Sequence, residues 1–450
     1  MQILRYKQEI IMRTFFKTVI VFILTWEARR VLKTWRPFIV LVSGSVGKTT
    51  TKDAVYHVLK DSIATRKSEK SFNSEIGVPL TILGLENAWS SPLAWLKNIW
   101  LGFRVPRAQS YPKLLVLEVG SDHPGDIARL MKWLTPDIAV VTCLPQVPVH
   151  VENFESPESI RREDALVTQA LREGGVYIAN ADDEHAYLLT DETDKRKLRS
   201  LTYGFGRRAK LQGLSPKVRY AKNEGVDAPV GMQFDVTWED ETFPVYLNGV
   251  LGVQSCTAAL AALAVGIARG LSFFRMTEAL FHLETPPGRM RVIEGKNGST
   301  IIDDTYNSSP IALSAALAAL RDITGKRRIA MLGDMLELGT YSEEEHWKAG
   351  RLAGAFVDEL VTVGKRARWI AEAAKSSGLP QGCIHEFATS DEAGEFMLSI
   401  LERGDVILAK GSQGGGENII RMERAVKVLM AHPEEARSKL VRQEDEWTQR

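Results

Sequence analysis

The sequence has little cysteine, no long apolar run and almost no net charge. Its three cysteines, Cys143, Cys256 and Cys383, lie far apart and form neither a disulfide framework nor a CxxC pair, which fits a reducing, cytosolic setting. Lys plus Arg number 57 and Asp plus Glu 56, so the 450-residue chain lacks the cationic surplus that holds a nucleic acid. Hydrophobic residues are 44% and charged residues 25%, which excludes a disordered or fibrous chain.

The near-zero total hides an N-terminal excess of cations, since residues 1–36 contain eight Lys or Arg and two Glu. Residues 18–26 are uncharged, but nine residues are too few for a membrane-spanning helix, which needs about 20. No small-residue cleavage site follows them, so a signal peptide is also excluded. Five apolar residues fall at helical spacing in a one-sided stripe: Ile11, Phe15, Val19, Phe22 and Trp26. This predicts a basic amphipathic helix that either packs on the next domain or lies on an anionic membrane surface.

A glycine-rich turn follows the first predicted strand, the apolar, β-branched residues 38–43. The turn reads Gly44-Ser-Val-Gly-Lys-Thr-Thr50 and leads into a helical pattern over residues 52–59. Strand, turn and helix together predict a P-loop, in which backbone N–H groups and the helix N-terminus face phosphate oxygens. In such a loop Lys48 contacts the β- and γ-phosphates and the Thr49 hydroxyl reaches Mg²⁺.

Two more strands are predicted, at residues 114–120 and 137–142. Glu118 ends the first of them, at the edge of a parallel sheet where ligands bind. Because Mg²⁺ near phosphates takes carboxylate oxygen, Glu118 is a candidate metal ligand. His150 follows the second strand and is either an ordinary loop histidine or a functional group.

These motifs resemble the Mur ligase family of ATP-dependent amide-bond ligases, from about residue 38 to residue 430. The resemblance rests on an ordered set of blocks: Gly44–Thr50, Ser71-Phe-Asn-Ser-Glu-Ile-Gly-Val-Pro79, the Glu118 strand, His150-Val-Glu-Asn-Phe154, Asn180-Ala-Asp-Asp183, Asp303-Asp-Thr-Tyr-Asn-Ser-Ser-Pro310, Leu332-Gly-Asp-Met-Leu-Glu-Leu-Gly339 and Lys410-Gly-Ser-Gln413. The blocks at 303–310 and 332–339 are similar to the branch that adds D-alanyl-D-alanine to UDP-N-acetylmuramoyl tripeptide. The Asp-Asn-Pro-Arg block of the diaminopimelate-adding branch is absent.

The resemblance implies an α/β fold with a P-loop ATPase domain around a parallel sheet, residues 37–288. A C-terminal Rossmann-like domain with a charged tail, residues 289–450, would close over the site. Residues 201–253 read as an antiparallel appendage of short strands. Family members begin with a UDP-binding domain, and here only about 37 residues precede the ATPase strand. We therefore expect that domain to be absent or replaced by the basic amphipathic segment 1–36.

The resemblance also implies the roles of the site residues. The expected ATP-binding residues are Gly44, Ser45, Val46, Gly47, Lys48, Thr49, Thr50, Gln254, Ser255, Arg289 and Asp304, with Arg289 at the γ-phosphate and Asp304 at the ribose. The expected catalytic residues are Lys48, His150, Asp164 and Arg289. The expected metal ligands are Thr49 and Glu118 for one Mg²⁺ and His150 with Asp164 for a second. The family's adenine-contacting helix motif GxHNxxNALAA is altered here, with Gln254 in place of the His.

Asp164 stands fourteen residues after His150, where family members often carry a carbamylated lysine. A carbamate is a carboxylate-like group on a long stem, and aspartate is a shorter, permanent carboxylate. We therefore hypothesise that Asp164 replaces the carbamate and removes any CO₂ requirement. The alternative is a charged, solvated helix face over residues 158–164.

The function implied is a cytoplasmic, ATP- and Mg²⁺-dependent ligase of peptidoglycan precursor synthesis, whose partners are UDP-muramoyl peptide and D-Ala-D-Ala. The alternatives are a Mur-like ligase for another carboxylate and amine, or a non-catalytic nucleotide-binding homologue. No nucleic-acid partner is expected. A Trp-rich segment, residues 89–111, contains Trp95, Trp100 and Phe103 beside several cations. Its aromatic side chains are expected to pack inside the domain, or else to form an interfacial patch like that of the N-terminal helix.

Overall fold

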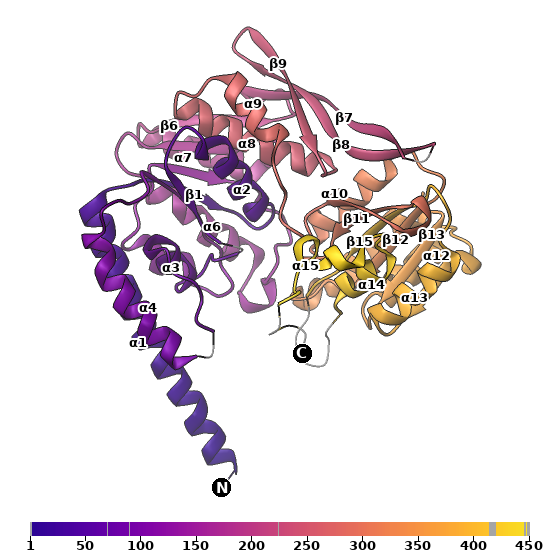
Figure 1. Cartoon of the computed structure of the whole chain (residues 1–450), viewed down its shortest axis with the longest axis horizontal. Coiled ribbons are helices and arrows are strands. Elements are labelled where there is room, and N and C mark those ends of the chain that lie inside the picture. Colours follow the sequence, from indigo (N-terminus) through magenta and orange to yellow (C-terminus); the bar gives the residue numbers. More distant parts are fainter. Residues whose placement is uncertain are drawn as a thin grey trace.

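The computed structural model describes residues 2–69, 71–89, 91–223, 225–413, 420–444 and 447, and of residues 2–15 and 223 only the backbone. Two sheets divide the chain, one built from residues 38–248 and the other from residues 291–410. Figure 1 shows them side by side, with the N-terminal helix α1 projecting away from both. The expected α/β fold is confirmed.

The first sheet has nine strands in the order β2-β3-β1-β4-β5-β6-β7-β8-β9. Their bounds are β1 Phe38–Ser43, β2 Thr65–Lys67, β3 Leu114–Glu118, β4 Ile138–Val141, β5 Val176–Asn180, β6 Arg199–Gly204, β7 Leu211–Asn223, β8 Val226–Trp238 and β9 Glu241–Asn248. Pairing is parallel from β2 to β7 and antiparallel from β7 to β9. The antiparallel appendage is thus confirmed, but β6 belongs to the parallel part, and β7 and β8 are long, with 13 residues each.

Helices cover both faces of the first sheet, which explains the unbroken apolar runs of its central strands. In β1, Val40 and Val42 face α2 (Lys48–Lys60), α8 (Val253–Ala268) and α9 (Phe273–Phe281). Its neighbours Ile39 and Leu41 face the opposite layer. That layer consists of α1 (Gln2–Trp35), α3 (Gly77–Leu83), α5 (Asp126–Met131), α6 (Pro157–Gln169) and α7 (Glu184–Lys195).

The second sheet has the order β10-β11-β15-β12-β13-β14, with only the edge strand β10 antiparallel. The bounds are β10 Arg291–Glu294, β11 Thr300–Asp304, β12 Arg328–Gly333, β13 Glu359–Val363, β14 Ile384–Phe387 and β15 Val406–Lys410. On one face lie α10 (Pro310–Arg321), α11 (Ser342–Gly354) and α12 (Arg368–Ser376). On the other lie α13 (Ser390–Ile400), α14 (Met422–Leu429) and the short α15 (Ala436–Lys439). This arrangement is the expected Rossmann-like layering.

The N-terminal helix packs on the first sheet, but not through the stripe that the sequence suggested. Its buried apolar residues are Leu24, Ala28 and Val31, which join the core of that sheet. Phe22 and Trp26 of the stripe are exposed by 70% and 40%. The side chains of Ile11 and Phe15 lie outside the described part of the chain. Over residues 16–35 the helix therefore buries one face and leaves Val19, Phe22 and Trp26 of the predicted stripe outward.

The Trp-rich segment forms α4 (Pro92–Arg104), which lies along α1 (Figure 1). Trp100 and Phe103 are exposed by 58% and 41%, so the expectation that they pack inside the domain is wrong for these two rings. Trp95 is half-buried against the core. The search of the described residues finds no helix long and apolar enough to cross a bilayer.

The tail after α14 is not simply a solvated extension of the second domain. Arg442 is buried, and its guanidinium donates to the backbone carbonyl of Thr305 (3.1 Å) and to that of Tyr306. Glu423 of α14 balances its charge. The tail thereby supports the loop after β11. Residues 414–416 are a glycine run that, from the sequence, fits either a closing lid or a plain surface loop, and they lie outside the described residues.

Candidate active site

The glycine turn after β1 has the backbone that a P-loop needs. Gly44 has a φ of +120°, and a Cβ there would lie 2.5 Å from the Thr142 hydroxyl, so a side chain is excluded. Gly47, with a φ of +84°, then caps the N-terminus of α2. The Lys48 ammonium curls over the turn and donates to the carbonyls of Gly44 (2.6 Å) and Ser45 (3.4 Å). The cation and the helix N-terminus thus share one concave surface, which favours a phosphate group.

Thr49 and Glu118 lie together at the mouth of this turn. The Thr49 hydroxyl donates to Glu118 Oε1 at 3.2 Å. Glu118 is 1% exposed, and its Oε2 has no hydrogen-bond partner, although the Lys52 ammonium lies 3.7 Å away. A buried carboxylate oxygen without a hydrogen bond, beside a hydroxyl, fits a hard cation such as Mg²⁺. Glu118 and Thr49 thus lie together beside the glycine turn, and their role as metal ligands stays a prediction.

Asp164 of α6 reaches the same turn from the other side. Its carboxylate accepts hydrogen bonds from Ser45 Oγ (3.2 Å) and Ser121 Oγ (2.9 Å). Burial raises the pKa of Asp164, while the nearby Lys48 charge and the two hydroxyls favour ionisation. Since the side chain is 1% exposed, the alternative of a solvated helix face is wrong.

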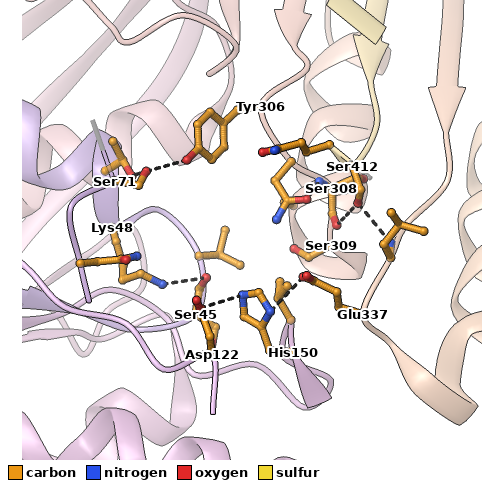
Figure 2. Close-up of a pocket in the computed structure, with 18 of the residues that line it drawn as sticks. Ser45, Lys48, Ser71, Asp122, His150, Tyr306, Ser308, Ser309, Glu337 and Ser412 are labelled. Atoms are coloured by element: carbon orange, nitrogen blue, oxygen red, sulfur yellow. Dashed lines mark hydrogen bonds and ion pairs between the residues drawn. The ribbon is translucent and has the colours of Figure 1, made fainter. Parts of the chain in front are cut away.

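His150 joins the two sheets across the cavity shown in Figure 2. It has a left-handed backbone (φ 65°), which turns its ring toward the second sheet. Its Nδ1 lies 2.9 Å from Glu337 of the second sheet's loop, and its Nε2 lies 3.3 Å from Asp122. Burial opposes the charged ring, but these two carboxylates outweigh it and raise the pKa of His150. With both nitrogens engaged, His150 can bind a metal ion only after it releases one carboxylate.

Arg289 stands at the junction of the two sheets, held by its neighbours. Asp303 accepts from the backbone N–H of Gly288 (2.9 Å), and Asp304 accepts from that of Met290 (3.2 Å). The guanidinium of Arg289 stacks 4.0 Å from the centre of the Tyr306 ring, and the Nε of Arg289 makes no hydrogen bond. Burial raises the pKa of Asp303 to about 6. The two aspartates thus fix the backbone on both sides of Arg289.

Tyr306 makes a second link between the sheets, also visible in Figure 2. Its hydroxyl donates to Ser71 Oγ at 2.9 Å, across 235 residues of sequence. Ser71 lies 3.3 Å from the Thr49 hydroxyl. A chain of contacts therefore runs from Arg289 through Tyr306 and Ser71 to Thr49. It connects the residue expected to contact the γ-phosphate with a residue expected to bind the metal ion.

Two cavities meet at Arg289. The His150 cavity, of about 640 Å³, is lined by Ser45, Val46, Gly47, Lys48, Thr49, Glu118, His150, Asp164 and Arg289 among others. The Gln254 cavity, of about 770 Å³, is lined by Val46, Gly47, Thr50, Gln254, Ser255, Arg289 and Asp304 among others. All predicted site residues except Gly44 thus line one cavity or both, and Gly44 shapes the turn between them.

In the Gln254 cavity, some polar groups are already engaged. Asp304 holds Lys410 at 2.5 Å, and burial lowers the pKa of that lysine although Asp304 opposes the effect. The Ser255 hydroxyl donates to the carbonyl of Leu251 at 2.8 Å, so its proton is unavailable to a base in this conformation. The amide of Gln254 has no such intramolecular hydrogen bond among the described contacts, and it is the better candidate for adenine.

Sequence reasoning assigned no role to Ser71, Asp122, Tyr306, Glu337 or Lys410. Four of them lie inside or beside blocks that carried the resemblance, but nothing in those blocks shows which side chain faces which. Asp122 had no sequence signal beyond its place after β3. Their roles follow from the packing of the two sheets, which brings loops far apart in sequence to one cavity.

Fold and cavities together define a nucleotide-dependent ligase of two α/β domains. Residues 42–266 match the Mur ligase middle domain, and residues 288–413 match the Mur ligase, glutamate ligase domain. The chain belongs to the Mur ligase family, whose members are ATP-dependent ligases. ATP and Mg²⁺ are the cofactors of this family.

Several relatives of known function cover most of the chain. The UDP-N-acetylmuramoyl-tripeptide--D-alanyl-D-alanine ligase of Bacillus subtilis is 28% identical over 400 residues, which are 87% of this chain and 76% of the relative. The enzyme of that name from Mycobacterium tuberculosis (strain CDC 1551 / Oshkosh) is 31% identical over 84% of this chain and 71% of its own. The MurF ligase of Thermotoga maritima in complex with ADP superposes with a TM-score of 0.72, at 25% identity, over 92% of this chain and 84% of its own.

Proposed function

We propose that this enzyme joins D-alanyl-D-alanine to UDP-N-acetylmuramoyl tripeptide with ATP, in peptidoglycan precursor synthesis. The relatives that carry this activity in their names match most of the chain, including both domains. The observation that carries the proposal within the structure is the junction at Arg289. There a cavity fit for a nucleotide meets a second cavity lined by Lys48, Glu118 and His150.

The reaction would pass through two steps. A carboxylate oxygen of the tripeptide attacks the γ-phosphorus and ADP leaves, which gives an acyl-phosphate. The amine of the dipeptide then attacks the acyl carbon, loses a proton, and phosphate leaves as the amide forms. Both steps need charge neutralisation and positioning more than covalent chemistry from the protein.

The P-loop and Arg289 would share that work. Lys48 and Arg289 line the same cavity, and each would donate hydrogen bonds to phosphate oxygens. Thr49 and Glu118 would hold Mg²⁺, which neutralises phosphate charge when bound. In the described part of the chain no three His, Cys, Asp or Glu residues cluster as a metal site. A Mg²⁺ ion near phosphates can take a single carboxylate and complete its shell with phosphate and water.

Asp164 would support the second metal position with His150, as a carboxylate that needs no carbamylation. What supports this is the burial of Asp164 and its place, together with His150, in the lining of one cavity. We propose domain borders at 36/37, just after α1, and at 288/289, just before β10. The free thiols Cys143, Cys256 and Cys383 fit a cytoplasmic location. Membrane contact is a separate proposal, argued below.

Phosphate release from ATP tests the activity, with UDP-muramoyl tripeptide and D-Ala-D-Ala omitted in turn. Release that requires both substrates supports the proposal. Release with a different carboxylate and amine would redirect it to another Mur-type ligase. ATP binding without turnover, with a panel of amines and carboxylates, would favour a non-catalytic homologue. Lys48→Ala serves as the inactive control.

A further inference from the structure

Exposed apolar side chains are concentrated on one part of the molecule. Sixteen large apolar side chains of the described residues are strongly exposed, and nine of them lie on α1, on α4 or just before α4. They are Phe16, Val19, Phe22, Trp26, Trp89, Leu93, Leu96, Trp100 and Phe103, and they are here called the α1–α4 face. A cluster of this kind marks an interaction site rather than the scattered apolar residues of an ordinary surface.

Helices α1 and α4 lie side by side at one edge of the molecule, and the N-terminal part of α1 projects beyond it (Figure 1). Only Asn98 and Gly102 of α4 are buried. Gly102 lets the helices touch, because a Cβ there would lie 2.0 Å from Glu27 Oε2. The rings of Trp26 and Phe103 meet at 5.3 Å. Since α4 packs on α1 through so little of its surface, most of its apolar side chains remain outward.

Cations continue the apolar stripe of α1 toward the body of the protein. Phe22, Trp26, Arg29 and Lys33 follow one another at intervals of three or four residues, so they lie on one side of the helix, and Arg36 comes directly after its last residue. The outer end of this stripe is apolar and the inner end is basic. This order of side chains matches the interface of an anionic bilayer, where the apolar acyl chains lie next to charged headgroups.

Other cations border the same face. They are Arg30 on α1, Lys97 and Arg104 on α4, and Arg107 just after it. Arg30 stacks on Trp26 at 4.7 Å and Arg104 on Trp100 at 4.6 Å. Within the described part of the chain, none of these four, nor Arg29, Lys33 or Arg36, forms an ion pair with a carboxylate. Their charge is available to an external anion.

A basic cavity lies at the foot of α1, where the stripe reaches the body. Its volume is about 770 Å³. It is lined by two indole rings and five cations: Trp26, Trp133, Arg29, Arg30, Lys33, Arg36 and Arg172. Arg172 is neutralised by Asp137, but the other four are not. The cavity therefore offers phosphate groups a site beside the apolar face.

We propose that the α1–α4 face docks the enzyme on an anionic membrane surface, with its aromatic and leucine side chains in the outer apolar layer and the basic cavity at the phosphate headgroups. An anionic bilayer can bind both the apolar and the basic part of the face. Tryptophan rings and the side chains of Lys and Arg are favoured at its interface with water. A second copy of the chain could cover the apolar side chains of the face. It would, however, bring its own seven cations, which form no ion pair, close to the seven of the first copy. The proposal adds a location to the proposed activity and does not depend on it.

Vesicle flotation with the full chain tests the proposal. We expect binding to vesicles of phosphatidylcholine mixed with phosphatidylglycerol, weaker binding at high salt, and little binding to phosphatidylcholine alone. The double variant Arg29→Glu/Lys33→Glu should bind roughly tenfold or more weakly, because each basic residue near such a surface contributes several-fold. The double variant Phe22→Ser/Trp100→Ser should also lose most binding.

Matched changes elsewhere give the controls. Phe274→Ser and Lys375→Glu alter an exposed ring and an exposed cation away from the face, and both should bind like the wild type. ATP-dependent phosphate release should be unchanged in all these variants, which shows that they are folded. Absence of binding by the wild type, or full binding by both double variants, would overturn the proposal. So would a dimer in light scattering that Phe22→Ser/Trp100→Ser abolishes, since the occupant would then be a second copy.

Discussion

The carboxylate of Glu27 is buried between α1 and α4 without a hydrogen-bond partner, and its removal should make the protein more stable at high pH. Burial raises its pKa from 4.5 to about 7, although Arg30 partly offsets the effect. Below pH 4.5 the folded and unfolded states both carry the proton. Between pH 4.5 and 7 only the unfolded state ionises, so stability falls, and above pH 7 the loss is constant.

The size of this loss follows from the two pKa values. The difference between 4.5 and about 7 corresponds to about 3 kcal/mol, at about 1.4 kcal/mol for each tenfold change in proton affinity. Any water that enters between the helices lowers this figure, which is therefore an upper bound. Glu27→Gln keeps the shape beside Gly102 and removes the titration. Relative to wild type, the variant should gain up to about 3 kcal/mol between pH 4 and pH 8.

Urea unfolding of both proteins, followed by tryptophan fluorescence from pH 4 to pH 8, measures this difference. Other titrating groups, such as Asp303, are present in both proteins and cancel. Glu86→Gln changes an exposed carboxylate that precedes α4 and is the matched control. A difference for Glu27→Gln that does not vary with pH would refute the reasoning, because the Glu27 carboxylate would then be hydrated or paired in the folded protein.

Three further predictions concern the site. Arg289→Ala should lower kcat for phosphate release by about 10²–10³, as expected for a group that stabilises transition-state charge, while Arg289→Lys should recover only part of it. Tyr306→Phe removes the hydrogen bond to Ser71 but keeps the ring under Arg289, so kcat/KM should fall by no more than about tenfold. Tyr306→Ala also removes the ring, so kcat/KM should fall further. Equal losses of kcat/KM in the two variants would contradict a role for the stacked ring. Asp164→Ala should raise the Mg²⁺ concentration needed for activity, and wild-type activity should not respond to bicarbonate; full activity and unchanged Mg²⁺ dependence in the variant would exclude a role in metal binding.

The P-loop and the parallel strands could be predicted because their signals are local. Residues 38–60 hold a strand, a turn and a helix start in unbroken order, and backbone sterics at Gly44 and Gly47 decide the turn without help from distant residues. Glu118 and Asp304 could be placed for a similar reason, since the end of a parallel strand is a known position for a ligand group. Asp164 was found by counting from His150, although its burial was not visible in the sequence.

The N-terminal helix shows where this kind of inference ends. The sequence indicates an apolar stripe on this helix, but a stripe alone does not reveal whether a partner covers it. The structure buries Leu24, Ala28 and Val31 instead, because the loop before β3 returns as α4 and the body contacts another side of the helix. The path of α4 likewise decides that Trp100 and Phe103 lie at the surface and not in the core. The spacing of apolar residues in the sequence does not encode that path.

By itself, the sequence determined the α/β class, the phosphate-binding turn and the set of polar groups available for catalysis, since each depends on short-range backbone geometry or on residue chemistry. Only the tertiary structure decided which of these groups face one another. The contact of Tyr306 with Ser71, the pairing of His150 with Glu337 and the burial of Glu27 against Gly102 all join distant segments. Such contacts arise when two sheets and two helices pack together, and the free energy of a buried charge or hydrogen bond depends on what that packing places beside it.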